Sequence, residues 1–161
     1  MVLATGLGKT WLAAFDSDRP EFPRILFVAH REEILNQAIQ VFRRIRPTSR
    51  IGRLAGEQRE TSADLVFASV QTLGRVPHLS RFQPDDFDYI VVDEFHRAAA
   101  GTYRRVIDYF QPKFLLGLTA TPDRTDGADL LALCQENLVF EVNIRNGIEA
   151  RLRAALSPLS R

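Results

Sequence analysis

The sequence predicts an α/β fold in which helices cover both faces of a mainly parallel central sheet. Short apolar runs alternate along the chain with longer segments of helical periodicity, which is the order of repeated β-then-α units. The apolar runs are hydrophobic throughout rather than at every second residue, as in parallel strands buried on both faces. A glycine-rich segment ending in Lys9-Thr10 stands between the first strand and the first helix. Together these features predict a three-layer α/β/α domain of the P-loop type.

The composition suits one domain of ordinary size. Of the 161 residues, 45% are hydrophobic and 25% are charged, which is enough apolar material for one core. The single cysteine, Cys134, excludes an internal disulfide framework and a multi-cysteine zinc site. No apolar run approaches the ~18 residues of a membrane span, and the first residues do not resemble a secretion signal. We therefore expect a cytoplasmic protein with no membrane partner.

The basic residues are unevenly divided between arginine and lysine. The formal net charge is only +1, so no overall field points to nucleic acid. All but two of the 21 basic residues are arginine. Arginine binds phosphate well, yet a codon bias of the genome explains the excess more simply. The scarcity of lysine draws attention to Lys9, which lies inside the glycine-rich segment.

The first third of the chain predicts two strands and two helices. A short strand at Val2–Ala4 leads into the glycine-rich segment, and a helix from Lys9 to about Phe15 ends before the next proline. Residues 24–29 form an apolar run typical of a buried strand. Residues 31–46 predict an amphipathic helix, because apolar side chains recur at three- and four-residue spacing: Ile34, Leu35, Ala38, Ile39, Phe42 and Ile45.

The middle of the chain predicts two short strands and a further helix. Residues 51–54 and 64–68 are apolar enough for strands. The polar segment Gly56–Ser62 between them is expected to be a loop. A helix is expected to begin within Ser69–Leu73.

The second half predicts two strong strands with a helix between them. Tyr89–Asp93 and Phe114–Leu118 are apolar runs of strand length. The helix expected at 103–110 would place four apolar side chains on one face: Tyr103, Val106, Ile107 and Phe110. A short helix at 129–134 and a strand at 138–142 are expected after them.

The glycine-rich segment is the sharpest local signal for a bound ligand. The residues Ala4-Thr5-Gly6-Leu7-Gly8-Lys9-Thr10 follow a strand and open a helix. Glycine allows positive φ angles that turn backbone N–H groups inward, and the helix start adds its dipole to that anion site. Lys9 can reach the outer phosphates of a nucleoside triphosphate, and the Thr10 hydroxyl can ligate Mg²⁺. The alternative is a plain glycine-rich turn before a helix, which the Lys-Thr pair disfavours.

Two carboxylates stand at the carboxyl end of the strand 89–93. Asp93 and Glu94 end the apolar run, and His96 follows. Ligands of doubly wound sheets bind at this end of the strands, where Asp93 can hold Mg²⁺ and Glu94 can polarise an attacking water. Because adjacent strand residues point to opposite faces, Glu94 is expected where the strand ends and the chain turns. A solvated strand end is the alternative, which the phosphate loop upstream disfavours.

Five segments together resemble the motifs of superfamily 2 helicases of the DEAD/DEAH type. They occur in the family's order: Ala4–Thr10 (motif I), Val28–Arg31 (motif Ia), Ala68–Leu73 (motif Ic), Asp93–His96 (motif II) and Leu118–Pro122 (motif III). The chain looks most like the branch of type III restriction subunits and excision-repair-type DNA helicases. The resemblance implies a first RecA-like, ATP-binding domain over residues 2–150. Residues 151–161 lose the strand pattern and are expected to form a disordered or truncated tail.

Two positions depart from the common form of these motifs. Leu3 stands where the general phosphate loop has glycine, a variant that is common among superfamily 2 helicases. Phe95 stands where motif II more usually has alanine or cysteine. That position is not a ligand in the family, so the resemblance leaves the catalytic assignment intact.

The resemblance assigns a role to each matching residue. It implies that ATP is bound by Thr5, Gly6, Leu7, Gly8, Lys9 and Thr10, and that Mg²⁺ is bound by Thr10 and Asp93. The catalytic residues would be Lys9, Asp93, Glu94 and His96. Coupling of the γ-phosphate to the nucleic-acid track would involve Thr119, Ala120 and Thr121. The nucleic-acid backbone, DNA rather than RNA by analogy alone, would be held by Arg31, Ser69, Gln71 and Thr72.

Several of these roles have a plainer alternative. Arg31 can be an ordinary surface arginine at a helix start. Thr119 and Thr121 can reflect the preference of threonine for strand ends. His30 and His78 are interpreted as surface or loop residues, since three scattered histidines and one cysteine do not make a metal cluster.

The family's motor has two RecA-like domains, and no second one is recognised after Val142. Arginine fingers come from that second domain, and their loss lowers turnover by ~10³-fold or more. We therefore expect this chain alone to bind nucleotide weakly, to hydrolyse little and to unwind nothing. One alternative is a non-enzymatic remnant that binds nucleotide or nucleic acid. Another is an unrelated P-loop ATPase or GTPase, but that class predicts neither Gln71-Thr72 nor Thr119-Ala120-Thr121.

Overall fold

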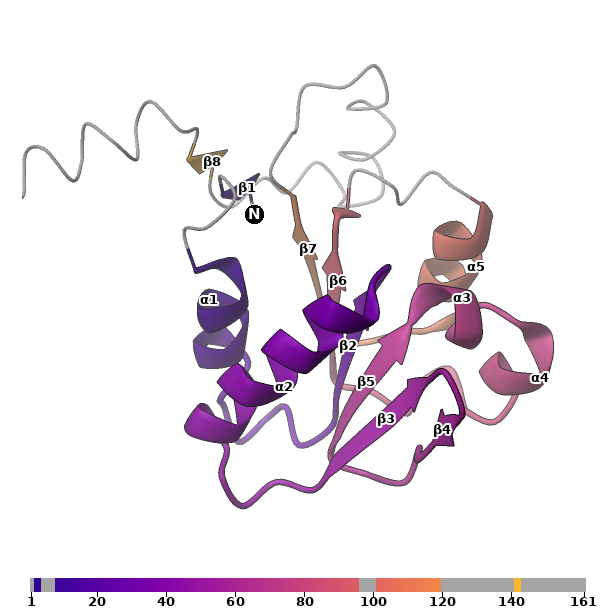
Figure 1. The fold of residues 1–161 in the computed structure, drawn as a ribbon, viewed down its shortest axis with the longest axis horizontal. Coiled ribbons are helices and arrows are strands. Elements are labelled where there is room, and N and C mark those ends of the chain that lie inside the picture. The colour runs from indigo at the N-terminus through magenta and orange to yellow at the C-terminus, as the bar shows by residue number, and fades with distance from the viewer. Residues whose placement is uncertain (1, 4–7, 96–100, 120–140, 143–161) are drawn as a thin grey trace, which may run out of the picture.

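The computed structural model describes residues 2–3, 8–95, 101–119 and 141–142 (Figure 1). The helices of these residues are α1 (Lys9–Asp16), α2 (Glu32–Ile45), α3 (Val70–Leu73), α4 (Val76–Leu79) and α5 (Gly101–Tyr109). The strands are β1 (Val2–Leu3), β2 (Ile25–Ala29), β3 (Ile51–Ala55), β4 (Gln58–Arg59), β5 (Leu65–Ser69), β6 (Tyr89–Asp93), β7 (Phe114–Leu118) and β8 (Glu141–Val142). None of the helices in the described part of the chain has the length and apolar character of a membrane span.

Six of these strands form one central sheet in the order β4-β3-β5-β2-β6-β7. Neighbouring strands are parallel, except that β4 runs antiparallel to β3. The strands β2, β5 and β6 are buried along their whole length, as expected of parallel strands with helices on both faces. The mainly parallel sheet predicted from the sequence is confirmed.

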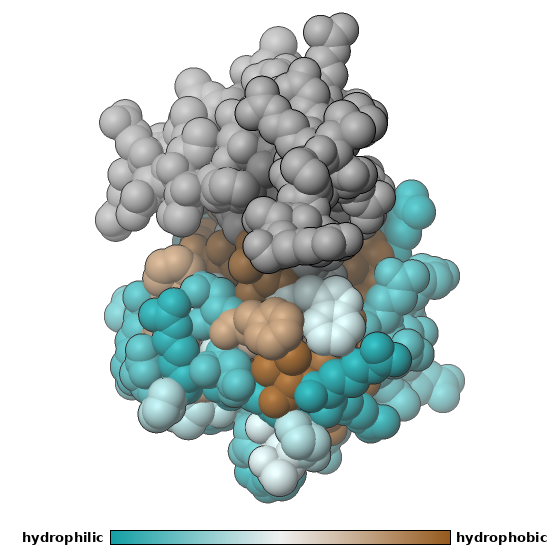
Figure 2. Space-filling view, turned by 90° about the vertical axis from the view of Figure 1, so that its left-hand side faces the viewer, coloured by the Kyte–Doolittle hydropathy of each residue, from teal (hydrophilic) through white to brown (hydrophobic). Residues whose placement is uncertain are grey.

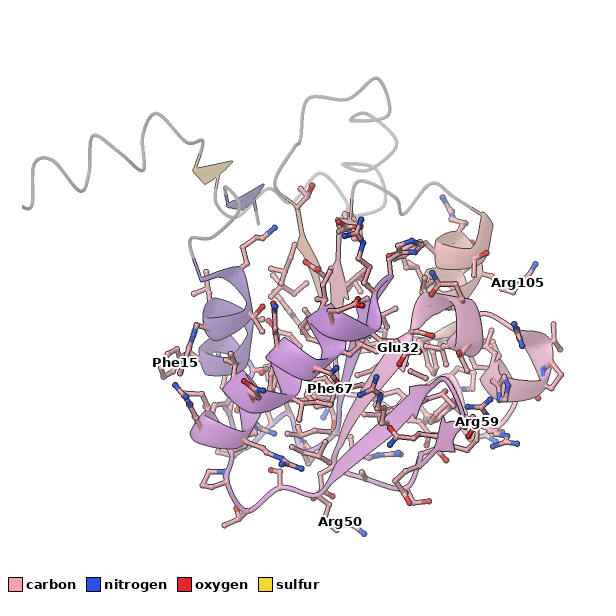
Figure 3. The ribbon with its side chains drawn as sticks, in the orientation of Figure 1. Phe15, Glu32, Arg50, Arg59, Phe67 and Arg105 are labelled. Carbon is pink, nitrogen blue, oxygen red and sulfur yellow. The ribbon has the colours of Figure 1, made fainter. Side chains whose placement is uncertain are left out.

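Alternate residues of the central strands fill two separate cores, one on each face of the sheet. Phe27 of β2 belongs to the core beneath α1 and α2, where its ring meets the rings of Phe42 and Phe67 at centroid distances of 5.9 and 5.7 Å. Figure 3 labels Phe67 where α2 crosses the sheet. The other core lies beneath α3, α4 and α5, and β2 contributes Leu26 and Val28 to it. The three-layer α/β/α arrangement is therefore confirmed.

Two short elements differ from the sequence-based prediction. The predicted loop Gly56–Ser62 contains β4, whose Arg59 lies opposite Leu54 of β3. The helix α4 follows Arg75 and was not predicted. Elements of two and four residues are too short to show a periodic pattern, so their contacts with the rest of the fold decide them.

The strand β1 lies outside the central sheet. It pairs in parallel with β8 over two residues, and the pair forms a separate two-stranded sheet. The strands predicted at 2–4 and 138–142 are thus observed at 2–3 and 141–142. The predicted helix at 129–134 and the tail at 151–161 lie outside the described residues.

Arg46 fastens the end of α2 to the turn that follows α1. Its guanidinium donates hydrogen bonds of 2.7 to 3.2 Å to one carboxylate and three backbone oxygens, those of Asp18, Ser17, Arg19 and Phe22. Only 10% of the Arg46 side chain is exposed, so water cannot readily replace these bonds. The contact fixes α1 against α2.

One side of α1 exposes hydrophobic side chains. Trp11, Leu12 and Phe15 are 36%, 38% and 59% exposed, and the rings of Trp11 and Phe15 stack with their centroids 6.0 Å apart. Figure 2 faces this side of the molecule and shows hydrophobic surface between hydrophilic residues. Figure 3 shows that Phe15 points outward from α1.

Candidate functional site

The carboxyl ends of four neighbouring strands lie side by side at one edge of the sheet. Ala29 of β2 is opposite Ser69 of β5, and Asp93 of β6 is opposite Leu118 of β7. The strands β2 and β6 are themselves parallel neighbours. Four of the five motif segments begin or continue at these ends. The sheet therefore gathers residues that are far apart in the sequence.

The start of α1 lies at this same edge. The helix runs antiparallel to β6 (Figure 1), and at the far edge the hydroxyl of Tyr89 donates to the carboxylate of Asp16 over 2.6 Å. The eight residues of α1 span about 12 Å and the five of β6 about 16 Å. Because their far ends are joined, Lys9 at the start of α1 lies at the edge where Asp93 ends β6.

Gly8 precedes α1 in a left-handed conformation. Its φ angle is 77°, which side chains other than glycine rarely adopt. The positive φ expected at Gly8 is thus observed. Glycine has no side chain to cap the first N–H groups of α1, and such groups bind anions at helix starts. Lys9 and Thr10 are half-buried in the first turn of the helix.

The two carboxylates differ in backbone conformation. Asp93 is the last residue of β6 and is only 8% exposed. Glu94 has a φ angle of 52° and is the only non-glycine residue with a positive φ in the described part of the chain. This conformation ends the strand, so the half-buried Glu94 no longer follows the strand's alternation. The turn expected at Glu94 is observed, and such backbone strain is typical of functional sites.

Phe95 packs across the end of β6 onto β7. Its ring is 4% exposed and lies over Gly117, where an added Cβ would come within 2.5 Å of the ring. The contact ties the segment after Asp93 to the strand that leads into the buried Thr119. Phe95 carries no predicted role. A glycine inside an apolar strand is the sequence signal for such a close approach.

Three of the residues predicted to hold nucleic acid lie at or just after the ends of β2 and β5: Arg31, Ser69 and Thr72. Ser69 caps α3, because its Oγ accepts the N–H of Thr72 at 3.3 Å and donates to Thr72 Oγ1 at 2.9 Å. Arg31 is the exposed N-cap residue of α2, and its side chain makes no capping bond. Since Ala29 lies opposite Ser69, the starts of α2 and α3 are neighbours at the site edge.

Gln71 reaches from α3 to the residue after β2. Its Nε2 lies 2.6 Å from His30 Nδ1 and 3.1 Å from the backbone oxygen of His30. The amide of Gln71, predicted to hold nucleic acid, is therefore bonded within the chain. His30, interpreted from the sequence as a surface or loop residue, is half-buried and links two motif segments. The two residues are 41 positions apart, so no local pattern signals the contact.

Six predicted site residues lie outside the described residues: Thr5, Gly6, Leu7, His96, Ala120 and Thr121. Within the described ranges, no three His, Cys, Asp or Glu side chains gather into a metal-binding group. Mg²⁺ that is bound with a nucleotide takes one or two protein oxygens and completes its shell with phosphates and water. Thr10 and Asp93 supply donors of that kind.

The comparisons with known proteins agree with this geometry. Residues 1–124 match the family model described as type III restriction enzyme, res subunit. The chain is 32% identical over 140 residues to a putative mitochondrial ATP-dependent helicase, irc3, of Schizosaccharomyces pombe, covering 80% of this chain and 23% of that protein. It is 30% identical over 134 residues to the DNA 3'-5' helicase XPB of Mycobacterium tuberculosis, covering 80% of this chain and 24% of that protein.

Among solved structures, the helicase domain of Hef from Pyrococcus furiosus has a similar fold. The TM-score is 0.65 at 26% sequence identity, over 83% of this chain and 32% of that one. The chain spans about a quarter of the length of the curated relatives it matches. The chain belongs to the family described as type III restriction enzyme, res subunit, and it has the RecA-like fold of superfamily 2 helicase domains.

Proposed function

We propose that this chain binds Mg-ATP at the edge where α1 begins and β6 ends, and that it couples ATP hydrolysis to movement along DNA. The observation that carries the proposal is that the segments with the predicted site residues lie at the same edge of the central sheet. The start of α1, the acidic end of β6 and the two strand ends with Arg31 and Ser69 lie along one side of one sheet. A nucleotide and a nucleic acid bound there would contact connected segments of the same sheet.

The start of α1 is the proposed cradle for the phosphates. Lys9 would pair with the β- and γ-phosphates, and the N–H groups of the first turn would donate to their oxygens. Gly8 is left-handed, which lets the backbone approach the phosphates without a side chain between them. The residues Thr5, Gly6 and Leu7 complete this loop in the proposal.

The two carboxylates of motif II have separate proposed roles. Asp93, with the hydroxyl of Thr10, would hold Mg²⁺, which neutralises charge on the phosphates when it is bound. Glu94 would orient and polarise the attacking water. Its positive φ turns the Glu94 side chain out of the strand's alternation, which supports a role distinct from that of its neighbour. His96 would sense the γ-phosphate.

The ends of β2 and β5 are the proposed track for nucleic acid. Arg31, Ser69 and Thr72 would bind backbone phosphates, which fixes position without reading sequence. Thr119, Ala120 and Thr121 would couple this track to the γ-phosphate. The packing of Phe95 on Gly117 supports this role, because it joins the segment after Asp93 to the strand that leads to Thr119. DNA is the proposed strand, because one of the relatives is named a DNA helicase.

The proposed domain covers residues 2–150. The complete helicase motor would also need a second RecA-like domain, which supplies the arginine fingers. Hydrolysis and movement are thus proposed for the complete motor. Binding of Mg-ATP and binding of nucleic acid are the steps that this chain can show by itself.

Titration calorimetry with Mg-ATP tests the nucleotide site directly. The wild-type chain is expected to bind, and Lys9→Ala is expected to weaken binding at least tenfold, since an ion pair with phosphate is lost. Lys113→Ala is the matched control, because Lys113 is the only other lysine and pairs with Asp88 at the opposite edge of the sheet. Equal affinity of the wild type and Lys9→Ala would refute the proposed site.

A further inference from the structure

The two contacts of the Gln71 amide determine which of its terminal atoms faces His30. The backbone oxygen of His30 can only accept a hydrogen bond. The atom 3.1 Å from it must therefore be the donor Nε2 rather than Oε1. The same Nε2 lies 2.6 Å from His30 Nδ1. Nε2 carries two hydrogens, which is one for each of these acceptors.

His30 Nδ1 must then accept a hydrogen bond. A histidine ring that accepts at Nδ1 is neutral and carries its proton on Nε2. A doubly protonated ring would set two donors against each other across the 2.6 Å contact. The ring's Nε2 lies across from Nδ1, so its N–H points away from Gln71. The backbone contact thus selects one tautomer of His30.

We propose that His30 is a further nucleic-acid contact, in which the Nε2–H group donates to a backbone phosphate, and that Gln71 positions this ring and selects its tautomer. The proposal rests on the nucleic-acid function proposed above. A phosphate offers only acceptors, so the tautomer with a bare Nε2 would repel it. His30 lies directly between the end of β2 and Arg31, which places both donors at the same strand end.

The role of Gln71 follows from the same bonds. Both N–H groups of the amide are used within the chain. The remaining Oε1 is an acceptor and cannot bond a phosphate oxygen. Gln71 is therefore a positioning residue, which acts on nucleic acid through His30.

The tautomer can be observed without nucleic acid. Long-range ¹H–¹⁵N NMR spectra distinguish the Nδ1–H, Nε2–H and imidazolium forms, and the chain has three histidines, so loss of one signal set in His30→Asn assigns His30. The Nε2–H pattern is expected near neutral pH. In Gln71→Ala the signals should shift toward a mixture of tautomers. A wild-type His30 in the Nδ1–H or imidazolium form would overturn the proposal.

Two substitutions separate the two nitrogens of the ring. Asparagine places an oxygen near the position of Nδ1 and lacks the outward donor, whereas glutamine places a nitrogen donor near the position of Nε2. Fluorescence anisotropy with a labelled single-stranded DNA oligonucleotide is the readout. His30→Asn is expected to weaken binding roughly tenfold, the value of a hydrogen bond to a charged group. His30→Gln and Gln71→Ala are expected to weaken binding by about threefold.

The salt dependence provides a second measurement on the same variants. A neutral donor releases no counterion, so His30→Asn should leave the slope of log affinity against log salt unchanged. His78→Asn is the matched control, because His78 lies on α4, and it should bind like the wild type. Equal urea midpoints confirm that each variant is folded.

The outcomes separate this proposal from the function on which it rests. If the wild-type chain binds no oligonucleotide, the nucleic-acid function itself is refuted, and the role of His30 with it. If the wild type binds and His30→Asn binds equally well, only the His30 donor is refuted. If His30→Asn lowers the salt slope by about one, His30 acts as a cation, which contradicts the assigned tautomer.

Discussion

The ring of Phe95 occupies the space that any side chain at Gly117 would need. A Cβ added at Gly117 would lie 2.5 Å from Cγ of the ring and 2.8 Å from both Cδ atoms. Phe95 directly follows the two carboxylates of the site, and Gly117 lies two residues before Thr119. Because Gly117 has no side chain, Phe95, and with it the turn at Asp93 and Glu94, can pack against β7.

Gly117→Ala should force the ring of Phe95 out of its place. Overpacking of this kind destabilises a fold by about 1 to 3 kcal/mol. Phe95→Ala should itself cost about 3 kcal/mol, because it leaves a cavity. The double variant should lose less than the sum, since the smaller side chain removes the clash. Urea unfolding measures all four proteins, and strictly additive losses would contradict the contact.

Glu94→Gln should separate nucleotide binding from hydrolysis. The amide keeps the size of the side chain but cannot polarise water, so ATP should bind normally while turnover falls by roughly 10²- to 10⁴-fold. The measurement is steady-state phosphate release by a protein that joins this chain to a second RecA-like domain. Glu57→Gln, at an exposed glutamate in the turn between β3 and β4, is the control. Full turnover by Glu94→Gln would remove Glu94 from the mechanism.

Arg31→Ala should weaken oligonucleotide binding and reduce its dependence on salt. Loss of one phosphate contact lowers the slope of log affinity against log salt by about 1 unit. Arg43→Ala is a matched control, because Arg43 is also an exposed arginine of the α2 region but lies in the last turn of that helix. An equal effect of both variants would indicate only a general charge effect.

Arg46→Ala should destabilise the fold far more than Arg50→Ala. Arg46 is 10% exposed, and its removal leaves three backbone oxygens without their donor, a loss of about 2 kcal/mol or more. Arg50 and its partner Asp64 are 72% and 37% exposed, and such a surface pair contributes little to stability because water screens it. Urea midpoints of the two variants give the comparison. Similar losses of stability in both variants would mean that the hydrogen bonds of Arg46 do not stabilise the fold.

Asp88 should make the fold less stable in acid. Burial raises the pKa of this carboxyl, but the bonds from Lys113 and from the backbone N–H of Arg24 outweigh burial, so the pKa of Asp88 lies below its ordinary value. A lowered pKa in the folded state stabilises the fold above about pH 4. That contribution is lost as the pH falls through the lowered pKa. Urea midpoints between neutral and acid pH should fall less steeply for Asp88→Asn than for the wild type.

Much of the fold follows from local patterns in the sequence. The uninterrupted apolar runs at Tyr89–Asp93 and 24–29 predicted strands buried on both faces, and both are observed in the centre of the sheet. The three- and four-residue spacing in 31–46 predicted α2. The alternation rule along a strand placed the turn at Glu94, where the φ angle is 52°. These features are local because backbone geometry alone repeats every two or 3.6 residues.

Only the tertiary structure decided which strand ends become neighbours. The order β5-β2-β6-β7 sets Ser69 beside Ala29 and Asp93 beside Leu118, and no local pattern encodes that order. The contact of Gln71 with His30 and the contact of Phe95 with Gly117 exist only once those strands are paired. The physical reason is that hydrogen bonding between parallel strands and close packing act between residues far apart in the chain, whereas periodicity records only which face of an element is buried.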